Sequence, residues 1–446
     1  MKSIDESAKT SRRDFVKQST LLAGGLLAAP LMSKAGYFHS VDDTIKIALV
    51  GCGGRGTGAA MQALLTKQNV KLVAMADAFR DRLDDCYKLL SDPANEEGNV
   101  SAKVSVPEDA KFVGFDAYTK AIALADVVIL TTPPGFRPIH FAEAIRAGKH
   151  VFMEKPIATD PAGVKSVIET AQLAKAKKLN VVVGLQRHYQ NSYRELYKRV
   201  KDGMIGEITS GQVWWNNDGV WVKMREPSQT EMEYQMRNWY YFNWLCGDHI
   251  NEQHIHNIDV MNWFKGAYPV KAQGMGGRQV RTGKEYGEIY DHHFVEFHYA
   301  DGSILNSQCR HQKGTYAKVD EMLVGTKGVV KCGDAQIIKK GKVAYQYDKK
   351  LENNPYQTEH DELFASIAKG EFKFEDAERV AKSTMTSILG RMATYSGEVV
   401  EWDKALNSGI SLMPTRFAWD ATPPTLPDAN GFYPIATPGT TKFFMS

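Results

Sequence analysis

A glycine-rich turn between a short apolar strand and a helix constrains this chain more than any other feature. The apolar run Ile45–Val50 leads into residues 51–56, which read Gly-Cys-Gly-Gly-Arg-Gly, and residues 58–67 have a helical pattern. In this setting Gly-x-Gly-x-x-Gly allows a tight turn, the close approach of a pyrophosphate, and close packing of helix on strand. The free N–H groups of the helix N-terminus favour phosphates. The sequence therefore predicts an α/β fold that binds a dinucleotide.

A second strand ends on an acid that fits the ribose of the same ligand. Residues 71–76 form an apolar run that ends at Asp77. A carboxylate about 20 residues after the last glycine accepts bonds from ribose hydroxyls and repels a 2′-phosphate, so NAD is favoured over NADP. Arg80 lies close by and could relax that choice, so NADP remains possible. The alternative role of Asp77 is to cap the next helix.

Two more strands continue the alternation of strand and helix. Residues 126–130 lead into Thr131-Thr132-Pro133-Pro134-Gly135, a helix follows from His140 to Ala147, and residues 149–153 end at Glu154-Lys155-Pro156. Strands that alternate with helices in this way predict a parallel, doubly wound sheet.

These segments together resemble the glucose–fructose oxidoreductase/inositol dehydrogenase (Gfo/Idh/MocA) family over roughly residues 44–400. The resemblance rests on the glycine turn, the Thr-Pro turn with His140 after it, and the Glu-Lys-Pro end of the last strand. It implies a Rossmann domain followed by an α+β domain whose open, mostly antiparallel sheet shields the active site. It also implies that Lys155 lies beside the nicotinamide. The expected dinucleotide contacts are Gly51, Gly53, Gly54, Arg55, Gly56, Asp77, Arg80, Thr132, Pro133, His140, Glu154 and Lys155.

A histidine-rich segment supplies the candidate catalytic groups. The resembled family carries an Asp four residues before a catalytic His; here Glu252 and His256 hold those positions, and His254 replaces a usual glycine. On one helix, residues 249, 252 and 256 share a face. A carboxylate one turn from a histidine suits a general base, with Lys155 as a second proton-transfer group. No metal is expected, but His249, Glu252 and His256 form an alternative set of ligands.

Substrate contacts are expected where the strand at residues 181–184 ends. Arg187 and Tyr189 follow this strand and could bind hydroxyl groups, although packing of the strand end against its neighbours explains them equally well. His254 is the third expected substrate contact.

The N-terminus reads as an export signal. Arg12-Arg13 precede an apolar stretch at residues 20–32, and Ser33-Lys34-Ala35 offer a cleavage site. This stretch is too short to span a bilayer comfortably, and the paired arginines predict a twin-arginine signal over residues 1–35 and a periplasmic protein. A frayed amphipathic helix is the alternative. Since this route carries folded proteins, the cofactor could be bound before export and then held tightly.

The 446 residues predict two domains. We expect the Rossmann domain at 44–184, the substrate-binding domain at 185–374, a helix at 375–400 that packs back on the first domain, and a Pro-rich extended tail at 401–446. That tail could grip a partner subunit in a homo-oligomer. A net charge of +3 does not favour nucleic acid or a membrane surface as a partner.

The function expected from these features is oxidation of a sugar or glycoside hydroxyl to a keto-sugar by an NAD(P)-dependent oxidoreductase. One alternative is a redox-neutral enzyme that cleaves glycosides by transient oxidation. The NAD-dependent glycosidases that resemble this family lack the Glu-Lys-Pro strand end, which favours the dehydrogenase. The non-enzymatic alternative is a sugar-binding protein with a vestigial fold, against which the intact glycines, Asp77 and Lys155 weigh.

Overall fold

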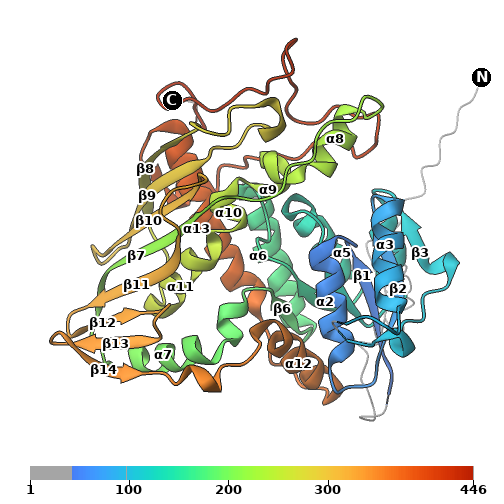
Figure 1. Cartoon of the computed structure of the whole chain (residues 1–446), viewed down its shortest axis with the longest axis horizontal. Helices are drawn as coiled ribbons and strands as arrows, with labels where there is room; N and C mark the ends of the chain where they lie inside the picture. The colour runs from blue at the N-terminus through green and yellow to red at the C-terminus, as the bar shows by residue number, and fades with distance from the viewer. Residues whose placement is uncertain (1–42, 97, 445–446) are drawn as a thin grey trace, which may run out of the picture. The chain divides into compact units, whose positions relative to one another are not determined.

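The computed structural model describes residues 43–96 and 98–444 and contains two sheets (Figure 1). The predicted export signal at residues 1–35 lies outside the described residues. Within the described part of the chain, no helix combines the length and the apolar character needed to cross a membrane.

The first sheet has six parallel strands in the order β3-β2-β1-β4-β5-β6. Its strands are β1 (Ile45–Val50), β2 (Val70–Asp77), β3 (Lys111–Val113), β4 (Val127–Leu130), β5 (His150–Met153) and β6 (Val181–Val183). The helices that connect them are α2 (Gly54–Leu65), α3 (Arg80–Ser91), α4 (Ala117–Ala123), α5 (Arg137–Arg146) and α6 (Pro161–Ala176). All four residues of β4 are buried, as expected for a strand covered on both faces. The strand order reverses at β1, and ligands bind at the carboxyl end of such a switch point.

The second sheet has nine strands in the order β14-β13-β12-β11-β7-β10-β9-β8-β15, and the neighbours whose pairing is known are antiparallel except for β10 and β7. Its strands are β7 (Ile208–Asn217), β8 (Lys271–Gly277), β9 (His292–His298), β10 (Ile304–His311), β11 (Lys318–Gly325), β12 (Gly328–Lys331), β13 (Gln336–Lys339), β14 (Lys342–Gln346) and β15 (Val400–Glu401). Alternate residues of β10 are buried, because one face of this sheet packs on helices. The predicted fold class, a Rossmann domain with a mostly antiparallel α+β domain, is confirmed.

The remaining helices join the two sheets. They are α7 (Asn191–Lys201), α8 (Glu231–Arg237), α9 (Asn243–Cys246), α10 (His249–Glu252), α11 (Ile255–Lys265), α12 (Pro355–Ala368), α13 (Asp376–Ser396) and α14 (Trp402–Leu406). Short 3₁₀ helices are η1 (Ser101–Lys103), η2 (Glu108–Ala110), η3 (Pro134–Phe136), η4 (Gln186–Tyr189), η5 (Trp239–Tyr241), η6 (Lys284–Tyr286) and η7 (Lys349–Leu351). Helix α13 contacts α6 and β6 of the first sheet's domain and β8 and β9 of the second sheet.

The C-terminal tail lies along its own chain. The amide of Leu412 donates to Asp160 at 2.7 Å, the side chain of Gln235 in α8 donates to the carbonyl of Thr425 at 2.8 Å, and Tyr290 donates to the carbonyl of Ala436 at 2.8 Å. In Figure 1 the tail, in dark red, passes beside α8. The described tail is thus anchored within the chain, and the expectation that it grips a partner subunit stays a prediction.

Candidate active site

The glycine turn has the geometry that a pyrophosphate needs. Gly51 has a φ of +98°, and a Cβ at Gly56 would lie 1.9 Å from the carbonyl oxygen of Gly51, so both positions require glycine. A Cβ at Gly53 would meet nothing within 4 Å, because this residue lines an open pocket. Helix α2 begins at Gly54, so its free N–H groups face the same space.

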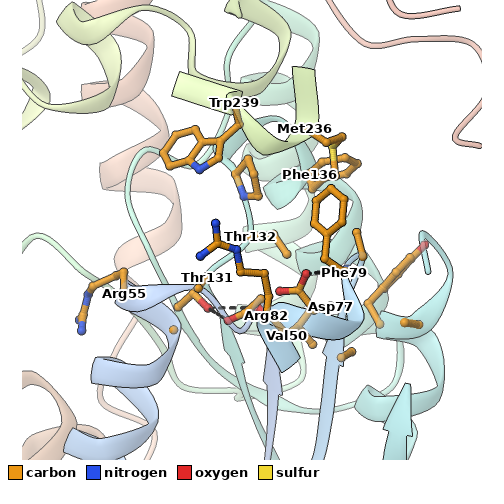
Figure 2. Close-up of a pocket in the computed structure, with 18 of the residues that line it drawn as sticks. Val50, Arg55, Asp77, Phe79, Arg82, Thr131, Thr132, Phe136, Met236 and Trp239 are labelled. Atoms are coloured by element: carbon orange, nitrogen blue, oxygen red, sulfur yellow. Dashed lines mark hydrogen bonds between the residues drawn. The ribbon is translucent and has the colours of Figure 1, made fainter. Parts of the chain in front are cut away.

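The pocket over this turn is a cavity of about 530 Å³. Its charged lining residues are four cations and one carboxylate, namely Arg55, Arg82, Lys223, Arg237 and Asp77. Figure 2 shows Val50, Thr131 and Asp77 on one side of the cavity and Trp239 and Met236 across from them. The size, the charge and the helix end suit a dinucleotide with its anionic pyrophosphate.

Asp77 closes β2 at the pocket wall. Its carboxylate accepts the amide of Cys52 at 2.6 Å and the amide of Phe79 at 2.9 Å. Burial raises the pKa of Asp77, and the two backbone hydrogen bonds oppose that shift. The carboxylate therefore braces the glycine turn and also lines the cavity.

Arg82 takes the position that the sequence suggested for Arg80. Arg80 pairs with Asp84 at 2.9 Å and with Glu108, and it does not line the pocket. Arg82 lines the pocket and, among the described residues, makes no hydrogen bond or ion pair; Figure 2 shows its guanidinium pointing into the cavity above Asp77. The assignment of Arg80 to the cofactor is corrected, since α3 begins at this residue and turns its side chain away.

The end of β4 forms another wall. Thr132, Pro133 and His140 all line the pocket. The hydroxyl of Thr132 lies 3.1 Å from Nδ1 of His140, and the buried guanidinium of Arg137 donates to the carbonyl of Thr132 at 2.7 Å. Burial lowers the pKa of His140 to about 3, so the ring is neutral.

Glu154 and Lys155 connect this pocket to the second domain. Nε of Arg55 donates to Glu154 at 2.6 Å. Nζ of Lys155 donates to the carboxylate of Glu252 at 2.9 Å and to the carbonyl of the same residue at 2.6 Å. Both side chains of this pair are only 12–13% exposed. Burial raises the pKa of Glu252 against the opposing charge of Lys155.

The predicted single helix from residue 249 to 256 is two helices. Helix α10 ends at Glu252 and α11 begins at Ile255. Among the described residues, the side chains spaced as metal ligands are those of Asp248, His249 and His293. One potential ligand atom of each lies within 4.8 Å of the other two. The alternative metal set of His249, Glu252 and His256 is corrected, because the break between the helices separates those three side chains.

His256 lies close to Lys155 and beneath an indole ring. Its ring stacks on Trp215 with centroids 5.8 Å apart, and the residue is 8% exposed. Burial, together with the charges of Lys155 and Arg187, lowers the pKa of His256 well below its usual value. Nδ1 of this neutral ring has no hydrogen-bond partner among the described residues.

Of the three expected substrate residues, Arg187 and His254 lie near His256, whereas Tyr189 bonds a residue of α13. Arg187 forms a buried ion pair with Glu321, near His256. Nε2 of His254 bonds the hydroxyl of Ser307 at 2.8 Å, and the residue is fully buried. The ring of Tyr189 is buried and its hydroxyl donates to Asp376 of α13 at 3.0 Å, so its assignment to substrate is corrected.

The sequence analysis missed several buried polar atoms, two of which belong to the stacking partner of His256, Trp215, and to its neighbour in sequence, Asn257. Among the described residues, Nε1 of Trp215, Oε1 of Gln186 and Oδ1 of Asn257 are buried without hydrogen-bond partners. Asn257 also donates to Glu321, the partner of Arg187, at 2.6 Å. No sequence signal marks Trp215, because the packing of α11 on β7 brings it beside His256, 41 positions further along the chain. Unpaired donors and acceptors at one place suit a ligand rich in hydroxyl groups.

Comparisons with known proteins agree with this geometry. Residues 45–185 match the profile "Oxidoreductase family, NAD-binding Rossmann fold", and residues 193–331 match the GFO/IDH/MocA C-terminal domain. Inositol 2-dehydrogenase of Rhizobium meliloti (strain 1021) is 26% identical over 64% of this chain and 75% of its own length. A glycosyl hydrolase family 109 protein of Solibacter usitatus (strain Ellin6076) is 27% identical over 47% of each chain.

The fold is also that of a solved dehydrogenase. Scyllo-inositol dehydrogenase of Lactobacillus casei, solved with NAD(H) and scyllo-inositol, has a TM-score of 0.60 and 20% identity over 81% of this chain and all of its own. With NAD as its cofactor and both characteristic domains present, the chain belongs to the Gfo/Idh/MocA family of NAD(P)-dependent oxidoreductases.

Proposed function

We propose that this protein is an exported dehydrogenase that oxidises a sugar or glycoside hydroxyl to a keto-sugar with a tightly held NAD. The observation that carries the proposal is the group formed by Lys155, Glu252 and His256. It brings proton-transfer side chains from both domains together, and Lys155 directly follows the strand whose Glu154 pairs with Arg55 at the dinucleotide pocket.

The chemistry divides between cofactor and protein. NAD, when bound, supplies the hydride acceptor. The carbinol carbon loses a hydride and its oxygen loses a proton, which leaves a ketone. The neutral ring of His256, which lies close to Lys155, accepts that proton, and Lys155, held by Glu252, orients the hydroxyl.

The substrate class rests on the polar atoms around His256. The unpaired groups of Trp215 and Asn257 supply a donor and an acceptor, which a polyhydroxylated ring would satisfy. A flat indole face next to them suits the apolar face of such a ring. The inositol 2-dehydrogenase relative supports a cyclic polyol or sugar.

The export half of the proposal rests on Arg12-Arg13 and the apolar stretch after them. A free nicotinamide pool is not expected outside the cytoplasm. A retained cofactor must then be regenerated in place, when a second substrate takes the hydride back.

A second candidate is redox-neutral cleavage of a glycoside. The similarity to the glycosyl hydrolase family 109 protein favours it, whereas the Glu-Lys-Pro strand end favours the dehydrogenase. Incubation with a nitrophenyl glucoside and with an inositol decides between them. We expect a keto product, detected by mass spectrometry as a loss of two hydrogens, without released nitrophenol. Stoichiometric nitrophenol would establish the glycosidase, and no product from any sugar tested would favour a binding protein.

A further inference from the structure

The dinucleotide cavity has a second wall that the Rossmann domain does not supply. Residues 219–239, which we call the strap, lie between β7 and the catalytic helices. Trp221, Lys223, Met236, Arg237 and Trp239 of the strap all line the cavity. Figure 2 shows Trp239 and Met236 facing Asp77 across the space in which the adenosine half of the ligand belongs.

Arg237 ties the strap to the Rossmann domain. Its guanidinium donates to Asp81, in the first turn of α3, at 3.0 Å, and lies 4.1 Å from the ring centroid of Phe79. The ion pair alone contributes little, because Asp81 is 55% exposed. The cation–π contact with Phe79 strengthens this tie. Phe79 follows Asp77 at the cavity wall, so the tie reaches the cavity itself.

The C-terminal tail fastens the same wall from outside. Phe417 and Trp419, which we call the latch, do not line the cavity. Trp419 contacts Phe79 and Phe115 in tilted arrangements with ring centroids 5.0 and 4.6 Å apart, and the ring centroid of Phe417 lies 5.4 Å from that of Phe136. Those three phenylalanines follow β2, β3 and β4, so the latch touches the carboxyl ends of strands on both sides of β1.

The tail also holds the strap directly. Gln235 of α8 donates to the carbonyl of Thr425, and Tyr433 donates to Glu231 and accepts from Arg225 at 3.1 Å. The strap is therefore fixed at both sides, to the Rossmann domain through Arg237 and to the tail through α8.

We propose that the strap and the latch close the adenosine half of the dinucleotide site, so that the bound cofactor leaves only when the latch opens. This inference rests on the proposed function in one respect, since it supplies the physical cause of cofactor retention. Trp419 touches the wall and not the cavity, so its removal changes the rate of opening without removing a contact to the ligand.

The test measures release of bound NADH from the holoenzyme after a chase with excess NAD, by the loss of nicotinamide fluorescence. Trp419→Ala should release NADH about tenfold faster than the parent protein, because two aromatic contacts are lost. Trp419→Phe keeps an aromatic ring, so its rate of NADH release should lie between those of the parent and Trp419→Ala. Arg237→Gln should also accelerate release, by about fivefold.

Arg416→Ala is the matched control, because Arg416 lies in the same tail and, in the described part of the chain, forms its ion pair with the nearby Asp420. Equal release rates in the parent, Trp419→Ala and Arg237→Gln would overturn the proposal. If the parent exchanges its cofactor within seconds but Trp419→Ala exchanges it faster still, the result supports closure by the strap and the latch. The same result contradicts the tightly held cofactor of the proposed function. Unchanged circular dichroism of Trp419→Phe keeps the comparison valid even if the alanine variant unfolds.

Discussion

Lys155 and Glu252 are separated by 97 positions in the chain, yet their side chains meet at 2.9 Å. Each is nearly buried, so each depends on the other to compensate its charge. The residue beside them, His256, is neutral and has a free nitrogen. Proton transfer at this site therefore depends on a few side chains whose removal can be tested singly.

Lys155→Ala and His256→Ala should each lower kcat by about 10² to 10⁴, the usual contribution of one positioned proton-transfer group. The bound dinucleotide should stay in place, since neither side chain lines its cavity. If the two groups act as one relay, the double variant is little slower than either single variant. Steady-state kinetics and a cofactor assay of denatured protein measure both points. Full activity in His256→Ala would exclude it as the base.

Arg82→Ala should weaken binding of NADP about tenfold and binding of NAD about threefold or less. The unpaired guanidinium beside Asp77 is the group that a 2′-phosphate would meet, and a charge-assisted bond of this kind contributes about 1.5 to 3 kcal/mol. Arg80→Ala is the control, because that side chain pairs with Asp84 outside the pocket. Fluorescence titration gives the affinities, and a parallel loss for both dinucleotides would contradict a role at the phosphate.

The difference between Arg80 and Arg82 shows where residue-level prediction from sequence stops. The sequence predicts the acid that ends β2, because the spacing of a Rossmann unit is nearly fixed. It does not predict which basic residue after that acid faces the ligand. That choice depends on where α3 begins, and the helix starts at Arg80 itself. Trp215 was unpredictable for a different reason, since only the packing of α11 on β7 brings it to His256.

At the scale of elements, the break between α10 and α11 decides the arrangement of the site. Spacing of residues 249, 252 and 256 favours one helix, and only tertiary contacts end α10 after one turn. Asp248 has a φ of +70° and caps α10, while its other carboxylate oxygen accepts the amide of Tyr290 at 2.9 Å. This single carboxylate therefore holds the helix that carries Glu252. Strand order and the parallel sheet, by contrast, follow from the alternation visible in the sequence.

Asp248→Asn should cost about 2 to 3 kcal/mol of unfolding free energy, because an amide cannot replace a buried carboxylate that accepts several hydrogen bonds. Burial alone would raise the pKa of Asp248, but hydrogen bonds and the charges of His293 and His249 hold it well below its usual value. Tyr395→Phe removes one of its donors and should cost about 1 kcal/mol. Urea unfolding measures both. Equal stability of Asp248→Asn and the parent would show that α10 is held by packing alone.

At the scale of the whole molecule, the buried histidines make stability depend on pH. Burial lowers the pKa of His140 and His254 to about 3, and shifts His256, His311 and His360 in the same direction. Near pH 5 the unfolded chain binds protons that the folded chain does not, so stability falls as pH drops below about 6.5. The carboxylate of Asp248, whose folded pKa is lowered, adds to this loss at still lower pH.

The unfolding free energy at pH 5 should therefore be lower than at pH 7.5 by about 2 kcal/mol for each of His140 and His254. Urea unfolding at the two pH values gives the difference. His254→Asn should reduce this difference in unfolding free energy by the contribution of one histidine, because Asn keeps a donor for Ser307 and does not titrate. A free energy of unfolding that is flat between these pH values would show that the buried rings gain protons in the folded state.

The position of the latch sets the order in which the protein matures. Trp419 is translated after every strand of both sheets, so the ribosome exposes a finished Rossmann domain before the residue that fastens its ligand cavity exists. If the latch retains the cofactor as proposed, retention begins only near the end of synthesis. A nonsense codon or a proteolytic cut before residue 417 would leave the catalytic side chains intact and yield an enzyme that loses its dinucleotide to dilution.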